Sequence, residues 1–190
     1  MIDASDNLID NCCRRTDPAA SLPGDDLLPV SVRSGLLSMR TTLDAPPGEV
    51  WPWLTRPDLL ARWSPVVPDR ALITAGAAEA RESPLSQVVD ATVLEVFEPF
   101  RLVHRWGLDT LVWQLGPADA GTQLQLVHRL TARDSFAEVA AGWHLCLGVL
   151  ARLIAGRAAE RLVGADAVSA GWASLRDAYR DRIVPNDADD

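Results

Sequence analysis

The stretch that decides the fold is SFAEVAAGWHLCLGVLARLIAG, residues 135–156. Its apolar residues recur at helical spacing, and further apolar residues stand on the other sides of the same helix. Ser135 followed by Glu138 predicts a capping box at its start, and Gly156 predicts its end. A helix that is apolar nearly all round is buried on more than one side, so the sequence predicts that a sheet curls around it or that another element covers it.

The chain before this helix has the composition of β-strands separated by short turns. The predicted strands are 36–43, 88–97, 101–106, 111–115 and 122–130. The last of them alternates most regularly, and the short connections predict an antiparallel meander. Two short helices should follow the first strand, beginning at Pro47 and Pro57. Residues 64–84 leave their pairing open, with 71–73 as a candidate irregular strand.

Beyond the long helix, apolar residues predict one further amphipathic helix that covers it. Their spacing is four, three and four: Val168, Trp172, Leu175 and Tyr179. The predicted organisation is a single domain over 31–183, with disordered acidic tails at 1–30 and 184–190, because these tails have too few apolar residues to form a core.

The net charge of −8 comes mostly from the two ends of the chain, with six Asp and two Arg in residues 1–30 and three Asp in the last four residues. The remainder is almost neutral and predicts no binding to nucleic acid or to a membrane. Every basic residue is Arg, which excludes lysine-dependent chemistry and suggests a bacterial chain from a GC-rich genome. The cysteines are Cys12, Cys13 and Cys146, which form no disulfide framework, and no signal segment is visible, so we expect a cytoplasmic protein.

Several segments, in their order, resemble a known family. They are LDAPPGEVW (43–51), PDLLARW (57–63), VLEVFEPFRLVHRW (93–106), GTQLQLVH (121–128) and AGWHL (141–145). Together they are similar to bacterial START-like proteins of the SRPBCC superfamily, in the branch of activators of the heat-shock ATPase. The resemblance covers about 36–156 and leaves 157–183 as a helical extension. The chain departs from it at 69–82, where Gly76 alone stands for the usual Gly-Gly turn.

The resemblance implies an α+β helix-grip fold, in which a curved antiparallel sheet wraps around the long C-terminal helix. In various relatives a cavity between the sheet and this helix holds lipids, polyketides, hormones or other amphipathic molecules. The candidate ligand-binding residues on this reading are Trp63, His104, Trp106, Trp113, His128 and Trp143. The alternative is that these side chains fill the core themselves, which would exclude a ligand from the space between them.

His104 and His128 are also the weak candidates for catalysis, because an imidazole can move a proton near neutral pH. They lie on predicted strands separated by a third strand, about 10 Å apart at the backbone, and no motif joins them to His144. We therefore predict no metal site and no cofactor. Cys146 lies in the middle of the apolar helix, so we interpret it as an inert core thiol.

Three functions stay open at this point. The first is a binding protein for a hydrophobic or amphipathic small molecule, which is not an enzyme. The second is an enzyme similar to polyketide cyclases and aromatases, in which His104 or His128 moves a proton. The third is a protein partner, either a chaperone ATPase regulator or a homodimer. No motif of a nucleotide-binding, hydrolase or metalloprotease site is present.

Overall fold

The computed structural model describes residues 27–119, 121–132 and 135–183. The helices are α1 (Pro47–Thr55), α2 (Pro57–Leu60), α3 (Phe136–Ile154), α4 (Ala165–Ser169) and α5 (Trp172–Arg182). The strands are β1 (Val30–Arg33), β2 (Leu36–Leu43), β3 (Val67–Pro68), β4 (Glu79–Arg81), β5 (Val89–Asp90), β6 (Val93–Phe97), β7 (Arg101–Trp106), β8 (Asp109–Ala118) and β9 (Gly121–Arg129).

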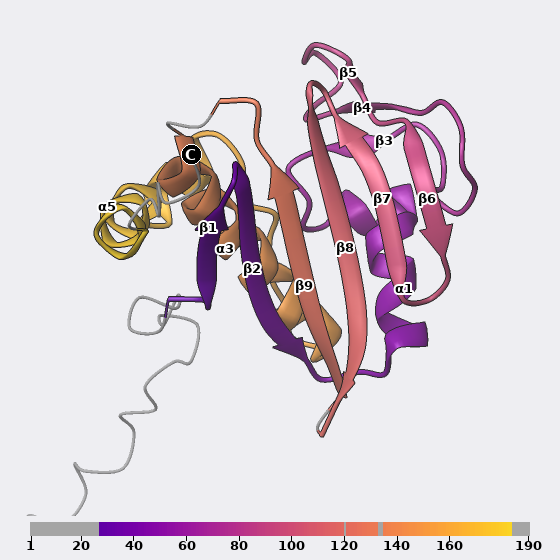
Figure 1. Ribbon diagram of the computed structural model, residues 1–190, viewed down its shortest axis with the longest axis horizontal. Coiled ribbons are helices and arrows are strands. Elements are labelled where there is room, and N and C mark those ends of the chain that lie inside the picture. The colour runs from indigo at the N-terminus through magenta and orange to yellow at the C-terminus, as the bar shows by residue number, and fades with distance from the viewer. Residues whose placement is uncertain (1–26, 120, 133–134, 184–190) are drawn as a thin grey trace, which may run out of the picture.

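A six-stranded antiparallel sheet in the order β1-β2-β9-β8-β7-β6 forms one layer of the molecule. Figure 1 looks onto its outer face, with α3 and α1 behind it and α5 beyond the β1 side. A smaller sheet joins β3, β4 and β5. The predicted α+β helix-grip architecture is therefore confirmed, and the meander of the last four large strands is antiparallel throughout.

Strand alternation decides which side chains meet α3. On β9, Leu124, Leu126 and His128 are buried, whereas Gln123 and Arg129 on the alternate positions are exposed. Because side chains of one strand alternate between faces, the first three residues point toward α3 and the last two toward solvent. The same alternation turns His104 on β7 and Trp113 on β8 toward the inner face, where both are buried.

The domain begins earlier than the sequence predicts. Strand β1 pairs with β2, and Leu27 and Leu28 before it pack against the core. The Leu28 N–H donates a hydrogen bond to the Tyr179 hydroxyl of α5 (3.0 Å), which ties the start of the sheet to the last helix. The tail boundary at residue 30 was therefore too late; residues 1–26 and the predicted tail 184–190 lie outside the described residues.

The segment predicted as one strand at 88–97 forms two, β5 and β6, which belong to different sheets. The Thr92 N–H donates to the Asp90 carboxylate between them (2.8 Å), so a local turn replaces the ladder. Residues 64–84 supply β3 and β4, which pair with each other, and β4 also pairs with β5. Residues 71–73 form no strand, although Leu72 is buried in the core.

Both ends of the helical half differ from prediction. Ser135 donates to the Ala132 carbonyl (2.9 Å) instead of capping α3, so the capping box is wrong. The Glu138 carboxylate instead forms an ion pair with the guanidinium group of Arg180 on α5 (3.1 Å). The sequence predicted one final helix, but the structure has two, α4 and α5, separated at Gly171, whose φ of 93° is not helical. Val168 on α4 is exposed and does not cover α3 as predicted.

Helix α3 is long and apolar enough to cross a membrane by length and composition alone. Most of its side chains are buried, on one side against the sheet and on another against α5. This is the pattern of a core helix in a soluble domain, and it explains why the helix is apolar nearly all round.

Candidate functional site

The structure brings together the six side chains that the sequence singled out, as a cluster between the sheet and α3. The ring centroids of Trp113 and Trp143 lie 5.3 Å apart, edge to face, and Trp63 packs against Trp113 in the same manner at 5.9 Å. Trp106 lies 5.3 Å from Trp143 and stacks on His128. Such edge-to-face pairs stabilise a core beyond the area that they bury.

His104 is held by two hydrogen bonds that use both ring nitrogens. The Trp113 indole N–H donates to Nε2 (3.0 Å), so the neutral ring carries its proton on Nδ1 and donates it to the Arg105 carbonyl (2.9 Å). Burial lowers the pKa of His104 to about 4, although the hydrogen bond to Arg105 opposes the change. The ring is therefore neutral at physiological pH.

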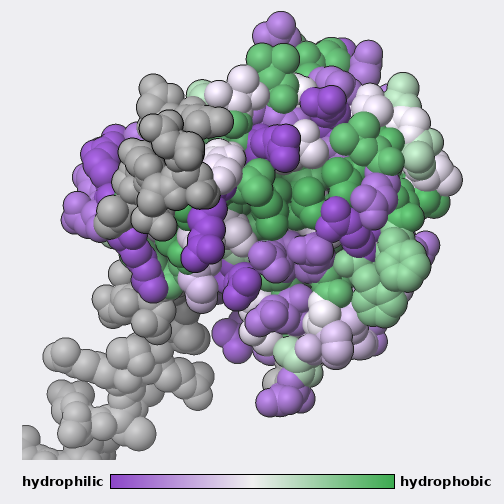
Figure 2. Space-filling view, in the orientation of Figure 1, coloured by the Kyte–Doolittle hydropathy of each residue, from purple (hydrophilic) through white to green (hydrophobic). Residues whose placement is uncertain are grey.

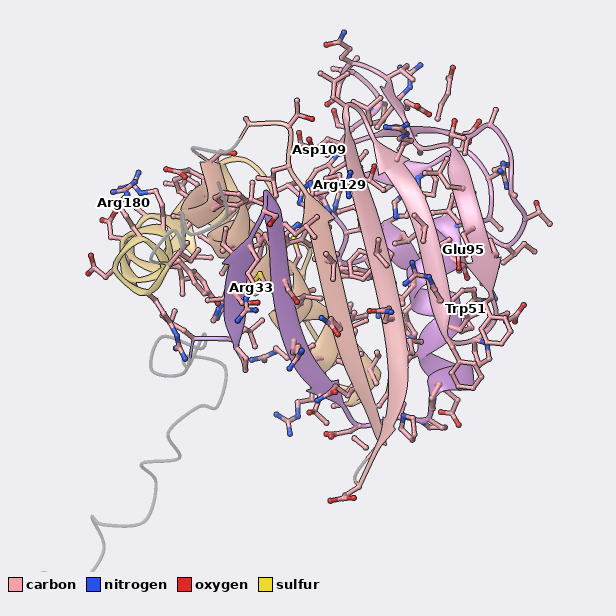
Figure 3. The ribbon with its side chains drawn as sticks, in the orientation of Figure 1. Arg33, Trp51, Glu95, Asp109, Arg129 and Arg180 are labelled. Carbon is pink, nitrogen blue, oxygen red and sulfur yellow. The ribbon has the colours of Figure 1, made fainter. Side chains whose placement is uncertain are left out.

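His128 is held in the same way but in the other tautomer. The Trp143 indole N–H donates to Nδ1 (3.1 Å), and Nε2–H donates to a carboxylate oxygen of Asp109 (3.0 Å). Burial lowers the pKa of His128, and the Asp109 carboxylate opposes the change. The other Asp109 oxygen accepts from the Thr131 N–H (2.7 Å), and Figure 3 shows Asp109 at the end of the sheet. Neither imidazole has a ring nitrogen left for a substrate.

Acid should destabilise the fold through His104. The unfolded pKa is about 6.5 and the folded pKa is lower, so the unfolded chain binds more protons between about pH 6.5 and pH 4. Stability is then lost as the pH falls through this window, by about 1.4 kcal/mol per pH unit and about 3 kcal/mol in all. Urea unfolding at several pH values measures this effect. Between about pH 4 and pH 6.5 the free energy of unfolding should change less steeply with pH for His104→Gln than for the wild type. Equal slopes would contradict the burial argument.

The cluster leaves almost no space inside itself. The cavity that it borders, together with Leu54, Leu60 and Leu72, measures about 20 Å³, room for about one water molecule. Four of the six predicted ligand-binding residues line this small space: His104, Trp106, Trp113 and Trp143. Among the residues that the structure describes, no group of three or more His, Cys, Asp and Glu could hold a metal ion.

A larger cavity of about 280 Å³ lies on the other side of Trp143, between α3 and the C-terminal extension; we call it the α3 pocket. Trp106 and Trp143 form its inner wall and Trp172 of α5 contributes from the extension. The remaining lining residues are Pro65, Glu82, Glu138, Val139, Gly142, Cys146, Leu162, Val163, Gly164 and Ala167. Two of the six predicted residues therefore border open space.

One arginine holds the extension in place beside this pocket. The Arg161 guanidinium donates to the carbonyl oxygens of Ser64, Pro65 and Glu82, at 2.6, 2.6 and 2.9 Å. It thereby joins the segment after α3 to the loop after α2 and to the end of β4. Burial raises the pKa of the Cys146 thiol to about 12, so this pocket residue is a neutral thiol.

Sequence reasoning missed the part of the pocket that the extension supplies. Leu162, Val163 and Gly164 precede α4 without a helical or strand period, so no pattern marked them. Trp172 was assigned to the helix that covers α3, but not to a site. The only available signal for Gly142 was a glycine within a helix, which lowers helix stability and often has a packing or functional reason.

Comparison with solved structures gives the same fold at low identity. A conserved protein of unknown function from Enterococcus faecalis aligns with a TM-score of 0.61 and 16% identity, over 82% of this chain and 89% of its own. CalU16 from Micromonospora echinospora aligns at 0.55 and 23%, over 78% and 96%. DynU16, described as a putative protein in the dynemicin biosynthetic locus, aligns at 0.55 and 23%, over 66% and 49%. These likenesses show the fold alone.

No curated protein matches the sequence significantly. The family model described as Activator of Hsp90 ATPase homolog 1-like protein matches residues 44–155, which run from the end of β2 through α3. Its range contains both short helices, the strands β3 to β9 and all six clustered residues. Because the match extends over more than half of the chain and the helix-grip fold agrees with it, the protein belongs to the Activator of Hsp90 ATPase homolog 1-like family of the SRPBCC superfamily.

Proposed function

We propose that the protein binds an apolar or amphipathic small molecule in the α3 pocket. The observation that carries the proposal is the contrast between two spaces that share Trp143: the filled one of about 20 Å³ and the open one of about 280 Å³. The larger volume is near the lower end of the usual range for ligand pockets. A molecule of two or three aromatic rings would fit it.

The chemistry of the pocket lining selects the kind of ligand. Three indole rings and several aliphatic side chains supply apolar contact, and flat rings can stack on indoles. The charged lining residues are the carboxylates Glu82 and Glu138, and no basic side chain borders the space. Glu138 is paired with Arg180, and Arg161 lies beside Glu82 and Cys146, so the lining carries little uncompensated charge and the pocket favours a neutral aromatic molecule.

The hydrogen bonds of the cluster argue against the alternative in which His104 or His128 moves a proton. A general base needs a free ring nitrogen within hydrogen-bond reach of its substrate. Both nitrogens of each ring are already paired, two of them with indole N–H groups that cannot accept a proton. A binding role is therefore the better proposal.

Gly142 offers a direct test because a Cβ atom built there meets open space. We expect Gly142→Leu to fill the pocket while the helix stays intact, since Leu is a better helix former than Gly. N-phenyl-1-naphthylamine, a neutral two-part aromatic probe, should bind the wild type and bind Gly142→Leu at least tenfold more weakly.

The matched control is Gly48→Leu, at an exposed glycine of α1 with open space around its Cβ position and far from the pocket lining. This variant should bind the probe as the wild type does. Equal binding by Gly142→Leu and the wild type, with both folded by circular dichroism, would refute the proposed pocket. Failure of the wild type to bind the probe or any neutral aromatic of similar size would do the same.

A further inference from the structure

The outer face of the large sheet carries a groove that the proposed function does not use. Strand register aligns five residues in one row across β1, β2, β9, β8 and β7: Arg33, Leu36, Arg129, Thr110 and Arg105. Arg105 and Arg129 therefore flank Thr110 on adjacent strands, with their Cα atoms about 10 Å apart. Both arginines are exposed, and Figure 3 shows Arg33 and Arg129 on this side of the sheet.

An open cavity of about 480 Å³ lies at this row. Its lining combines cationic, hydroxyl and aliphatic groups: Leu36, Arg105, Leu108, Thr110, Val112, Val127, Arg129, Leu130 and Thr131. Figure 2 shows apolar residues gathered on the outer face of the sheet and framed by hydrophilic ones. Leu108 at the rim is 83% exposed and adds apolar surface to the groove. We call this cavity the outer groove.

The outer groove is cationic in a chain whose net charge is −8. No acidic residue lines it, and the guanidinium groups of Arg105 and Arg129 form no ion pair with any described residue. The nearby Asp109 carboxylate already accepts hydrogen bonds from His128 and from the Thr131 N–H. The Asp90 carboxylate interacts electrostatically with Arg105, but its hydrogen bond comes from the Thr92 N–H. Both arginines thus remain available for an external anion.

We propose that the outer groove binds a free amphipathic carboxylate, with its head group between Arg105 and Arg129 and its apolar body on Val112, Val127 and Leu36. The guanidinium group of one arginine can donate two parallel hydrogen bonds to the two oxygens of a carboxylate. A second arginine adds a further positive charge beside the same head group. The half-buried aliphatic side chains beside the row supply the contact for a hydrocarbon chain. The outer groove favours an anion and the α3 pocket a neutral aromatic molecule, and the two sites lie on opposite faces of the sheet.

The test uses dodecanoate below its micelle concentration and isothermal titration calorimetry on the full chain. Wild-type protein should bind dodecanoate and should bind dodecanol, the neutral analogue, at least tenfold more weakly. The double variant Arg105→Gln with Arg129→Gln should lose at least tenfold in affinity for dodecanoate. Arg40→Gln, an exposed arginine of β2 four residue pairs away from the groove row, should leave the affinity unchanged.

Each other outcome overturns the proposal. Absence of binding, equal affinity for dodecanol, or equal losses in the double variant and Arg40→Gln would show that the groove is no carboxylate site. If sedimentation showed that the wild type is a dimer and the double variant a monomer, this face would be the contact with a second copy of the chain. Gly142→Leu should bind dodecanoate as tightly as the wild type, so failure of the α3 pocket and failure of the outer groove are distinguishable.

Discussion

Trp143→Ala should lower the free energy of unfolding by about 3 to 5 kcal/mol, the range for removing a fully packed tryptophan. The side chain is 3% exposed and contacts Trp106, Trp113 and His128. Its loss opens a cavity in the centre of the cluster and leaves Nδ1 of His128 without its indole donor. Urea unfolding at pH 7 measures the change.

Trp143→Phe separates the two causes at the same position. This variant keeps an aromatic ring but has no N–H to donate to His128, so it should lose less than Trp143→Ala, with about 1 kcal/mol of its loss from the missing hydrogen bond. If Trp143→Ala lowered stability by less than about 1 kcal/mol, the cluster would not be the packed centre of the domain, and the space beside it could rearrange to admit a ligand.

Gly121→Ala should cost about 3 kcal/mol or more, for a different reason. Gly121 starts β9 with a φ of 118°, which side-chain-bearing residues rarely adopt. A Cβ atom there would collide with the Leu43 carbonyl and crowd the Ala45 N–H, both of them backbone groups that cannot turn away. Backbone strain and overpacking each cost about 1 to 3 kcal/mol.

The control for this prediction is Gly116→Ala on β8 of the same hairpin, where a Cβ atom meets open space and φ is not positive. It should change stability by no more than about 0.5 kcal/mol. Thermal unfolding of both variants checks the pair. Similar midpoints for the two variants would show that the hairpin can shift away from Leu43, and that its close approach to the chain before α1 is not a fixed feature of the fold.

Much of the fold was predictable because it depends on local patterns. Strand β2 and the helices that begin at Pro47 and Pro57 were predicted correctly, and so was the antiparallel meander around α3. The wrong details arise from side chains that compete with regular structure. Asp90 interrupts a strand by accepting from Thr92, and Ser135 bonds to the Ala132 carbonyl rather than to the helix. Composition alone does not show which partner such a side chain takes.

The candidate site shows where sequence reasoning ends. Alternation on β7 and β9 was enough to turn His104 and His128 inward, and helical spacing was enough to bring Trp143 to them. Which ring nitrogen meets which indole depends on rotamers and on the register of β8 between them, and the sequence does not show these. The packing of these rings leaves only about 20 Å³ among them, whereas about 280 Å³ of space lies between Trp143 and Trp172.

The most direct test of the account is an NMR spectrum of the seven tryptophan indole N–H groups during titration with N-phenyl-1-naphthylamine. We expect the largest shifts at Trp106, Trp143 and Trp172, which line the α3 pocket, and no shift at Trp63, whose N–H donates to the Trp53 carbonyl within the core (2.9 Å). Shifts concentrated at Trp63 and Trp113 would instead place the ligand inside the cluster and contradict the proposed site.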